Sequence, residues 1–435
     1  MTITVIGHGY VGLVSACVFA DFGNTVYVVG HTKEKIERLR KGDPIIYEPG
    51  LKELLIKNIQ AKRIIFITEY EKAISSSNIV FIAVGTPSKP NGDADLSTVF
   101  DVAKKLSPHL KKDFTVVSCK STVPVGTNKK IEGIVNQYKP KNAEVAVASC
   151  PEFLREGTGI YDTLNADRVV IGSDSQKAIN FLLKLHKPMN GKRVITNLAS
   201  AELIKYAANA VLATKISFAN LISFYCEKAG ADVENVLDAV GMDKRIGRIF
   251  MDPGVGYGGA CFPKDVKAII SIGKDLGIDP ILFDAVEKIN FQARFNFFQK
   301  ILANTKGKKV AIWGLSFKPN TDDIREAPSL FIIQKLLENN FKINVYDPVA
   351  ENNVKKFYDE SKIKYFTDPY LAVEDVSALI ILTEWNEFKQ IDLEEVKKRM
   401  HDLIIFDGRN IYDPETMKSA GFSYYSIGRP PIKKI

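Results

Sequence analysis

The segment that decides the fold is TITVIGHGYVG, residues 2–12. Its first five residues are apolar or β-branched and predict a buried strand. Glycines at positions 7, 9 and 12 follow at once, and the apolar period of residues 13–22 predicts a helix. Between a strand and a helix, such glycines permit a tight turn, close packing and the approach of a pyrophosphate to the helix N-terminus. The segment therefore predicts dinucleotide binding.

The next strand, residues 25–29, ends where this fingerprint usually has an acid that binds the ribose hydroxyls. Gly30 stands there instead, and His31-Thr32-Lys33-Glu34-Lys35 follows it. The carboxylate that favours NAD over NADP is missing, and cations are close by. The usual preference for NAD therefore cannot be read from this position.

Two further apolar strands, residues 79–84 and 114–118, end at polar turns that contain Thr86 and Thr122. Ligands of open parallel sheets bind beyond the carboxyl ends of the strands, so both threonines are placed to meet a cofactor. A structural turn threonine is the alternative interpretation at each position.

Charged residues follow the strand at 145–149 and recur on a long helix. Glu152 and Glu156 lie four residues apart after that strand, where acids also stabilise a helix N-terminus through its dipole. A helical pattern then occupies about residues 200–240, and Lys205 and Asn209 share one of its faces. A solvated lysine and an interface asparagine are the alternative. A helix of this length suits a spacer between domains or a dimer contact.

Covalent chemistry is indicated by GYGGACFPKD, residues 256–265. Its glycines let the backbone approach a ligand closely, and they lead into the thiol of Cys261. A thiol is a nucleophile only as the thiolate, which the ammonium of Lys264 would favour, and the carboxylate of Asp265 can move protons. A buried cysteine after a glycine-rich turn is the alternative.

A second α/β half begins near Gly307. Strand patterns recur at residues 309–313, 342–346, 378–383 and 403–406, but no G-x-G-x-x-G accompanies them. This half should bind a ligand other than the dinucleotide. We therefore predict an α/β fold with two Rossmann-like, doubly wound parallel-sheet domains joined by a long central helix. The expected segments are a dinucleotide-binding domain (1–198), a helical dimerisation region with the cysteine loop (199–304) and a C-terminal domain (305–435).

Composition limits the class of protein. A chain of 435 residues with 46% hydrophobic and 25% charged residues is typical of a globular protein of two or three domains. No apolar run reaches the roughly 18–20 uninterrupted residues that span a bilayer, and the N-terminus opens a strand, so we expect a cytoplasmic protein without a membrane contact. The five scattered cysteines contain no C-x-x-C pair, so we expect reduced thiols and no metal. The net charge of +8 is spread along the chain, and it fits anionic small substrates as well as nucleic acid.

Motifs in unbroken order from residue 1 to about 415 resemble the UDP-glucose 6-dehydrogenases of the UDP-glucose/GDP-mannose dehydrogenase family. They are GHGYVG (7–12), KSTVPVGT (120–127), PEFLREG (151–157), the helix 202–210, the Cys261 stretch, FKPNTDD (317–323) with Arg325-Glu326, TEWNEF (383–388) and DGRN (407–410). The resemblance implies an N-terminal NAD domain, a dimerisation helix and a C-terminal UDP domain. It also implies that the C6 alcohol of UDP-glucose is oxidised twice, with two NAD⁺ per turnover, through a thiohemiacetal and a thioester.

The resemblance assigns roles to individual residues. Cys261 is the nucleophile, Lys205 and Asn209 donate to the developing oxyanion, and Asp265 is a base acting through water. Glu152 assists thioester hydrolysis, with Thr122 holding the water. The implied cofactor contacts are Gly7, Gly9, Tyr10, Val11, Gly12, Gly30, Lys35, Thr86, Thr122, Glu156, Lys264 and Arg325. The implied substrate contacts are Glu152, Phe153, Leu154, Lys205, Asn209, Arg245, Phe250 to Gly254, Tyr257, Gly258, Lys318 and Arg409, with Arg245 reaching across a homodimer.

The chain departs from the family at two positions, because the family has an aspartate where Gly30 stands and an asparagine where Cys150 stands. We expect NAD⁺ to be used with weak discrimination against NADP⁺, and Gly30→Asp to sharpen the preference. Cys150 adds a thiol that could make activity sensitive to oxidation. A sister enzyme acting on UDP-N-acetylmannosamine or GDP-mannose and a silent nucleotide-binding or nucleic-acid-binding module are the alternative functions.

Overall fold

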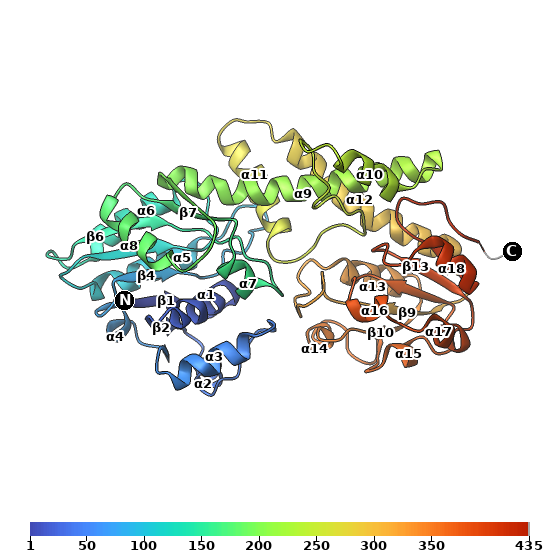
Figure 1. The fold of residues 1–435 in the computed structure, drawn as a ribbon, viewed down its shortest axis with the longest axis horizontal. Coiled ribbons are helices and arrows are strands. Elements are labelled where there is room, and N and C mark those ends of the chain that lie inside the picture. The colour runs from blue at the N-terminus through green and yellow to red at the C-terminus, as the bar shows by residue number, and fades with distance from the viewer. Residues whose placement is uncertain (434–435) are drawn as a thin grey trace. The chain divides into compact units, whose positions relative to one another are not determined.

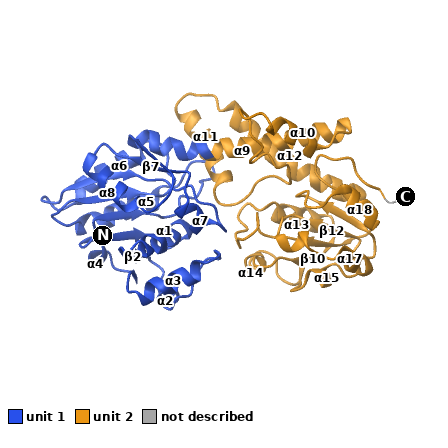
Figure 2. Cartoon of the chain, viewed as in Figure 1, with its two compact units in different colours: residues 1–208 blue, residues 209–435 orange. Residues whose placement is uncertain are grey.

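The computed structural model describes residues 1–433, so Lys434 and Ile435, the end of the expected third segment, lie outside the described residues. The chain forms two compact units, Met1–Ala208 and Asn209–Ile435 (Figure 2). The boundary falls inside one long helix, α9 (Leu198–Ala229), which contributes to both units (Figure 1).

The first unit is built on an eight-stranded sheet of order β3-β2-β1-β4-β5-β6-β7-β8. The strands are β1 (Thr2–Ile6), β2 (Thr25–Val29), β3 (Ile64–Ile67), β4 (Ile79–Ile82), β5 (Thr115–Cys119), β6 (Val145–Ser149), β7 (Arg168–Gly172) and β8 (Lys192–Thr196). The first six strands in this order are parallel, and β7 pairs antiparallel with β6 before running parallel to β8.

Helices cover both faces of this sheet. Apolar residues of α1, α3 and α8 pack on one face, and those of α4, α5 and α6 pack on the other. The helices are α1 (Tyr10–Asp21), α2 (Lys33–Arg40), α3 (Leu51–Gln60), α4 (Tyr70–Ile74), α5 (Ser97–Leu106), a 3₁₀ turn (Ser107–His109), α6 (Thr127–Tyr138), α7 (Gly159–Leu164) and α8 (Gln176–His186). The unit is therefore doubly wound, and its chain reverses direction across the sheet between β1 and β4, where ligands of such sheets bind.

The second unit begins with the helical part. Its helices there are the remainder of α9, α10 (Val233–Gly241), α11 (Phe262–Asp275) and α12 (Ile281–Asn304). A six-stranded parallel sheet of order β11-β10-β9-β12-β13-β14 follows. Its strands are β9 (Lys309–Trp313), β10 (Lys342–Tyr346), β11 (Lys364–Tyr365), β12 (Ala378–Ile381), β13 (Ile404–Asp407) and β14 (Ser423–Tyr425).

This second sheet is also covered on both faces. Phe297 of α12 and Leu336 of α13 belong to one core, and Phe388 of α16 and Met417 of α18 belong to the other. The helices of this half are α13 (Pro328–Glu338), α14 (Glu351–Val354), α15 (Pro369–Ala372), α16 (Asn386–Lys389), α17 (Leu393–Arg399) and α18 (Pro414–Ala420). The predicted fold class, with two doubly wound domains and a long helix between them, is confirmed.

Candidate active site

The N-terminal glycine loop has the geometry that a dinucleotide requires. A Cβ atom on Gly7, where φ is +119°, would lie 2.2 Å from the carbonyl oxygen of Ala83, and one on Gly12 would lie 2.2 Å from that of Gly7. These two glycines therefore allow β1, β4 and α1 to pack closely. Gly9 instead faces open space at the N-terminus of α1, where unpaired backbone N–H groups attract phosphate. The loop thus fits the pyrophosphate of NAD.

Tyr10 of this loop is held by protein groups. Its hydroxyl donates to Glu48 and accepts a hydrogen bond from the backbone N–H of Gly157 at 3.0 Å, and that N–H also lies 2.7 Å from Glu48 Oε2. Burial and the carboxylate of Glu48 raise the pKa of Tyr10 well above its usual value. Tyr10 therefore fixes α1 against the loop that carries Glu152 and Glu156.

The turns after β4 and β5 meet at the carboxyl edge of the first sheet. The hydroxyl of Thr86 donates to the backbone oxygen of Thr122 at 2.9 Å. Ser121 next to it donates to the backbone oxygen of Val84 at 2.6 Å. These bonds place Thr86 and Thr122 side by side at the edge where the sequence predicts the cofactor.

Glu152 and Lys205 form a buried ion pair in the first unit. The ammonium of Lys205 lies 3.0 Å from Glu152 Oε1, and the two side chains are only 5% and 8% exposed. The second carboxylate oxygen of Glu152 accepts the backbone N–H of Leu154 at 2.8 Å. Lys205 also lies 5.3 Å from the centre of the Phe153 ring, which gives a cation–π contact. Glu152, predicted to assist thioester hydrolysis, and Lys205, predicted to donate to the oxyanion, are thus paired with each other.

Cys150, which precedes this loop, has a structural role that the sequence did not reveal. It is fully buried, and its Sγ lies 3.8 Å from Nε2 of His186. Nδ1 of His186 lies 2.8 Å from the backbone oxygen of Leu182, which only accepts, so Nδ1 carries the proton. Nε2 is therefore the acceptor, and the Cys150 thiol is its donor. Burial raises the pKa of Cys150, which opposes the expected sensitivity to oxidation.

Cys261 lies at the N-terminus of α11 and is exposed, whereas the other four cysteines are buried. At this position the helix dipole and the first backbone N–H groups attract negative charge. Lys264 and Asp265 follow in the first turn of the same helix. Because Cys261 is exposed, the alternative of a buried cysteine after a glycine-rich turn is wrong.

Asp265 is buried and contacts two polar side chains, those of Asn209 and Lys264. It is 1% exposed, its Oδ2 accepts from the amide of Asn209 at 2.5 Å, and its Oδ1 pairs with Lys264 at 2.5 Å. An asparagine amide carries two N–H groups, so Asn209 keeps a second donor for a substrate oxygen. The middle of α9 and the first turn of α11 are joined at this carboxylate.

The glycines before Cys261 also serve protein packing. A Cβ on Gly258 would lie 2.4 Å from the backbone oxygen of Glu326, and one on Gly259 would lie 2.7 Å from the Phe317 ring. Gly259 also donates its N–H to the backbone oxygen of Arg325 at 2.8 Å. The loop is therefore held against the segment after β9.

Substrate candidates of the second unit gather at the carboxyl edge of its sheet. Lys318 follows β9, and Arg409 follows β13. The guanidinium of Arg409 donates to the backbone oxygens of Leu382 and Phe317, at 2.9 and 3.2 Å. A Cβ on Gly254 would lie 3.2 Å from the same guanidinium. Arg409, Gly254 and the loop of Lys318 are thus neighbours.

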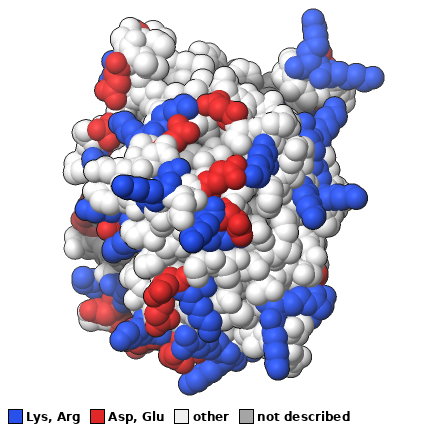
Figure 3. All heavy atoms as spheres, turned by 90° about the vertical axis from the view of Figure 1, so that its left-hand side faces the viewer, with Lys and Arg blue, Asp and Glu red and all other residues white. Residues whose placement is uncertain are grey.

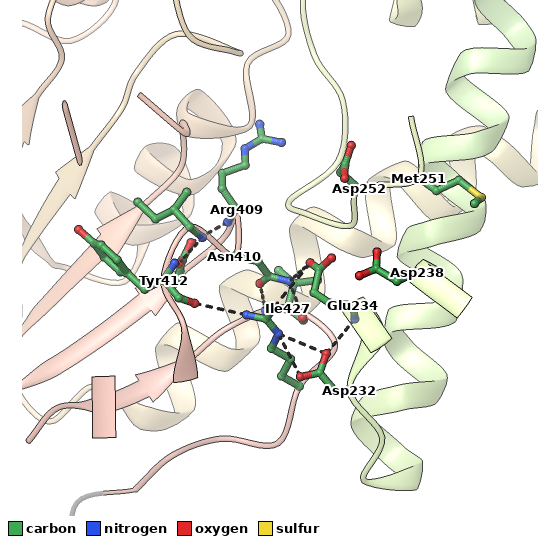
Figure 4. Close-up of polar contacts among 12 residues, drawn as sticks. Asp232, Glu234, Asp238, Met251, Asp252, Arg409, Asn410, Tyr412 and Ile427 are labelled. Carbon is green, nitrogen blue, oxygen red and sulfur yellow. Dashed lines mark hydrogen bonds and ion pairs between the residues drawn. The ribbon is translucent and has the colours of Figure 1, made fainter. Parts of the chain in front are cut away.

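Polar contacts fix α10 to this edge (Figure 4). The amide of Asn410 donates to Glu234 at 3.1 Å and to the backbone oxygen of Ile427 at 3.0 Å. Arg248 pairs with Glu234, Asp238 and Asp252 at 2.7 to 2.8 Å. This network holds the segment of Phe250, whose φ of +65° is strained for a residue with a side chain.

Two arginines and one tyrosine that the sequence predicts as ligand contacts are paired with carboxylates of the chain. Arg245 is 89% exposed and pairs with Asp243 at 2.6 Å, and Arg325 pairs with Asp323 at 2.6 Å. Tyr257 donates to Glu287 at 2.7 Å. Of the remaining candidates, Val11 belongs to the glycine motif, Leu154 follows Glu152 by two residues, and Lys35 lies in α2.

Comparison with known proteins assigns the family. Three family models match in order: the NAD binding domain of the UDP-glucose/GDP-mannose dehydrogenase family over residues 1–190, its central domain over 199–292 and its UDP binding domain over 311–414. The chain belongs to the UDP-glucose/GDP-mannose dehydrogenase family. The family predicted from the sequence motifs is therefore confirmed.

Several members of this family are similar over their whole length. The UDP-glucose 6-dehydrogenase TuaD of Bacillus subtilis is 46% identical, with 99% of this chain and 94% of that protein covered. The UDP-glucose 6-dehydrogenase of Pseudomonas aeruginosa is 43% identical, with 99% and 98% covered. A UDP-glucose dehydrogenase structure from Pyrobaculum islandicum has a TM-score of 0.91 at 36% identity, with 98% of each chain covered. A UDP-D-ManNAc dehydrogenase structure from Pyrococcus horikoshii has a TM-score of 0.85 at 26% identity, with 99% of each covered.

The central helix α9 is long and apolar. Of the helices in the described chain, only α9 could cross a membrane by length and composition, a test that core helices of globular proteins also pass. Its Glu202 accepts the backbone N–H groups of Gly126 and Asn128, both at 2.7 Å, and its Lys205 pairs with Glu152. These buried polar contacts hold the first turns of α9 on the first unit. Charges of both signs are interspersed on the face in Figure 3.

Some members of the site were missed by the sequence reasoning. Glu202 holds the N-terminus of α6 and thereby the turn of Thr122, although the sequence showed it only as part of a family motif. Asn290 of α12 accepts the backbone N–H of Tyr257 at 2.8 Å, and Asp347 and Asp407 hold the edge of the second sheet. No local signal distinguishes such residues, because their partners are distant in sequence.

Proposed function

We propose that this protein oxidises the C6 alcohol of UDP-glucose twice, with two NAD⁺ per turnover, and releases UDP-glucuronate. One observation carries the proposal: the exposed thiol of Cys261 stands at the N-terminus of α11, with Lys264 and Asp265 in the first turn and Asn209 bonded to Asp265. An alcohol dehydrogenase that stops at the aldehyde has no use for a nucleophile. A thiol placed for attack is useful when a second oxidation must follow.

The alcohol would be converted to the carboxylate by two oxidations, an addition between them and a final hydrolysis. The alcohol loses a hydride and a proton and becomes an aldehyde. The Cys261 thiol adds to the aldehyde carbon and gives a thiohemiacetal, which loses a second hydride and proton and becomes a thioester. Water then displaces the thiol and gives the carboxylate. Four electrons leave the sugar in total. When bound, NAD⁺ accepts one hydride in each oxidation.

The residues of the chain divide this work. The Lys205 ammonium and the second N–H of Asn209 donate to the oxyanion that develops at C6, which in a dry site stabilises the transition state by several kcal/mol. Asp265 takes protons through a water. Glu152, with a water held by Thr122, assists hydrolysis of the thioester. The buried pair of Glu152 and Lys205 supports this assignment, because each side chain is already oriented by the other.

The two nucleotides are assigned to the carboxyl edges of the two sheets. The glycine loop, Thr86, Thr122 and Glu156, together with Lys264 and Arg325, would hold NAD⁺. Phe250 to Gly254, Gly258, Lys318 and Arg409 would hold the UDP-sugar. The names of the relatives support UDP-glucose, and the higher identity to the UDP-glucose dehydrogenase structure than to the UDP-D-ManNAc dehydrogenase favours it over that sugar.

A substrate panel tests this proposal. Initial rates of NADH formation are measured with UDP-glucose, UDP-N-acetylmannosamine and GDP-mannose at equal concentrations. We expect UDP-glucose to give the highest kcat/KM. A higher value for either other sugar nucleotide would assign the protein to a sister activity, and no NADH with any of them would refute a dehydrogenase.

We also propose that the functional unit is a homodimer formed through α9. Val211, Phe218 and Tyr225 follow one another at intervals of seven residues, and they are 58%, 43% and 67% exposed. Seven residues return to nearly the same face of a helix, so these side chains form one apolar stripe. Such a stripe favours contact with a second helix. Light scattering should then give at least twice the chain mass of 48.4 kDa.

A further inference from the structure

His8 lies between the first two glycines of the glycine loop and occupies the space that a side chain at position 30 would need. A Cβ atom on Gly30 would lie 2.5 Å from Nδ1 of His8 and 2.8 Å from Cδ1 of Ile36. Contacts below 3.0 Å require one of the atoms to move. The backbone of Gly30 is outside the left-handed region, so a side chain there meets no backbone strain but requires the His8 ring and the end of the Ile36 side chain to move.

His8 is also poised for a ligand. Its side chain is 7% exposed, yet within the described residues its Nδ1 has no hydrogen-bond partner. A buried ring nitrogen without a partner is costly, and a bound polar group would satisfy it. The glycine loop that carries His8 is the one that fits the pyrophosphate of the dinucleotide. The adenosine ribose binds beside the end of β2 in such domains, and Gly30 directly follows that strand.

A second histidine and a lysine lie near His8. The centre of its ring lies 5.6 Å from that of His31. Burial and the charges of His31 and Lys35 lower the pKa of His8. A phosphate at this position would be attracted by the charge of Lys35 and could accept hydrogen bonds from the two imidazoles, whereas an acid at position 30 would repel it.

We propose that His8 replaces the residue at position 30 as the group that binds the adenosine ribose, and that His8, His31 and Lys35 together accept a 2′-phosphate. This inference rests on the proposed use of a nicotinamide dinucleotide. It makes positions 8 and 30 a coupled pair, in which one position carries a side chain and the other must be small. The single change Gly30→Asp, which the sequence alone led us to expect would sharpen the preference for NAD⁺, is then insufficient, because its side chain meets His8.

Binding of the cofactors without sugar tests this inference. The fluorescence of NADH and NADPH is titrated with wild-type protein, His8→Ala, Gly30→Asp and the double variant. We expect wild type to bind both cofactors within about tenfold of each other. Gly30→Asp should weaken NADH about tenfold or more, and the double variant should recover NADH binding and reject NADPH by about a hundredfold. His8→Ala should weaken NADPH more than NADH.

Controls separate a clash from charge and from misfolding. Gly30→Ala adds the Cβ without the charge, and it should also weaken NADH. Gly133→Asp lies at an exposed position of α6 with open space, and His401→Ala removes a histidine of the second unit that is 66% exposed, so neither should change binding. Thermal melting of each variant shows whether it folds, and the double variant tests the coupling even if Gly30→Asp alone fails to fold.

The outcomes are distinct. If Gly30→Asp alone binds NADH as tightly as wild type, or if the two substitutions act additively, His8 does not fill the role of position 30. If His8→Ala changes both affinities equally, it does not recognise the 2′-phosphate. If wild type binds neither cofactor, both the proposed function and this inference are refuted, whereas the other contrary outcomes refute the inference alone.

Discussion

The amide nitrogen of Asn209 lies 2.5 Å from Oδ2 of Asp265, and this bond joins the middle of α9 to the first turn of α11. Asp265 is 1% exposed, so its charge depends on Asn209 and Lys264. The helix that carries the proposed oxyanion donors is thereby held against the helix that carries the thiol.

Replacing Asn209 with alanine should affect both stability and catalysis. The loss of a donor to a buried carboxylate should lower the free energy of unfolding by about 1–3 kcal/mol. The loss of an oxyanion donor should lower kcat by about a hundredfold. Urea unfolding and steady-state rates measure the two effects. Asn180→Ala, at an exposed position of α8, is the control, and equal values for the two variants would contradict the assignment.

Alkylation should distinguish Cys261 from the other cysteines. Burial raises the pKa of Cys17 and of Cys119 to about 12, and it raises the pKa of Cys150 and Cys226. Iodoacetamide should therefore modify Cys261 first in the folded protein, and peptide mass mapping identifies the site. UDP-glucose should slow the reaction. Modification of Cys150 at the same rate would contradict the buried donor role given to it here.

His186 should make the protein less stable in acid. Burial and the charge of Lys120 lower its pKa in the folded protein to about 3, from an ordinary value of 6.5. The stability that neutral His186 contributes is complete above pH 6.5 and is lost as the pH falls toward 3. The free energy of unfolding then falls by up to about 1.4 kcal/mol per pH unit from this group.

His186→Gln tests this linkage, because glutamine does not titrate. Between pH 7 and 5, its free energy of unfolding should change less than that of wild type. His401→Gln, which removes an exposed histidine, should follow the wild-type curve. Parallel curves for wild type and His186→Gln would show that His186 does not titrate in this range.

The sequence predicted the strands whose carboxyl ends carry candidate site residues. It predicted the strands at the edges of the two sheets less well. Residues 2–6, 25–29 and 309–313 match β1, β2 and β9, because β-branched runs followed by glycine or polar turns are strong signals. The strands β3, β7, β8, β11 and β14 were not predicted. β8 is partly exposed and carries lysine and arginine, so it lacks the apolar run of a buried strand.

Contacts within the site could be predicted where the residues are close in sequence, and could not where they are distant. Cys261, Lys264 and Asp265 lie within one helical turn, so their proximity could be predicted from spacing alone. The pair of Cys150 and His186 could not, because 36 residues separate its members and only the packing of α8 on the sheet brings them together. The contact of His8 with Gly30 also needed the structure, because the positions lie on separate strand ends.

The proposed dimer predicts that two defective chains can complement each other. Arg245→Ala and Cys261→Ala should each be inactive alone, because Arg245 is proposed to act in the site of the neighbouring chain. After unfolding and refolding an equal mixture, half of the dimers contain both chains and each has one complete site. Activity should then reach about a quarter of wild type. No recovery, or an active monomer by light scattering, would contradict a shared site.

The stoichiometry of NADH tests the central claim most directly. A limiting, known amount of UDP-glucose is converted to completion with excess NAD⁺, the absorbance of NADH is recorded, and the product is identified by mass spectrometry. The account predicts two NADH and one UDP-glucuronate per UDP-glucose, no free aldehyde, and no acid from Cys261→Ala, which should still bind UDP-glucose. One NADH per sugar, or acid formation by Cys261→Ala at near the wild-type rate, would contradict covalent four-electron oxidation at Cys261.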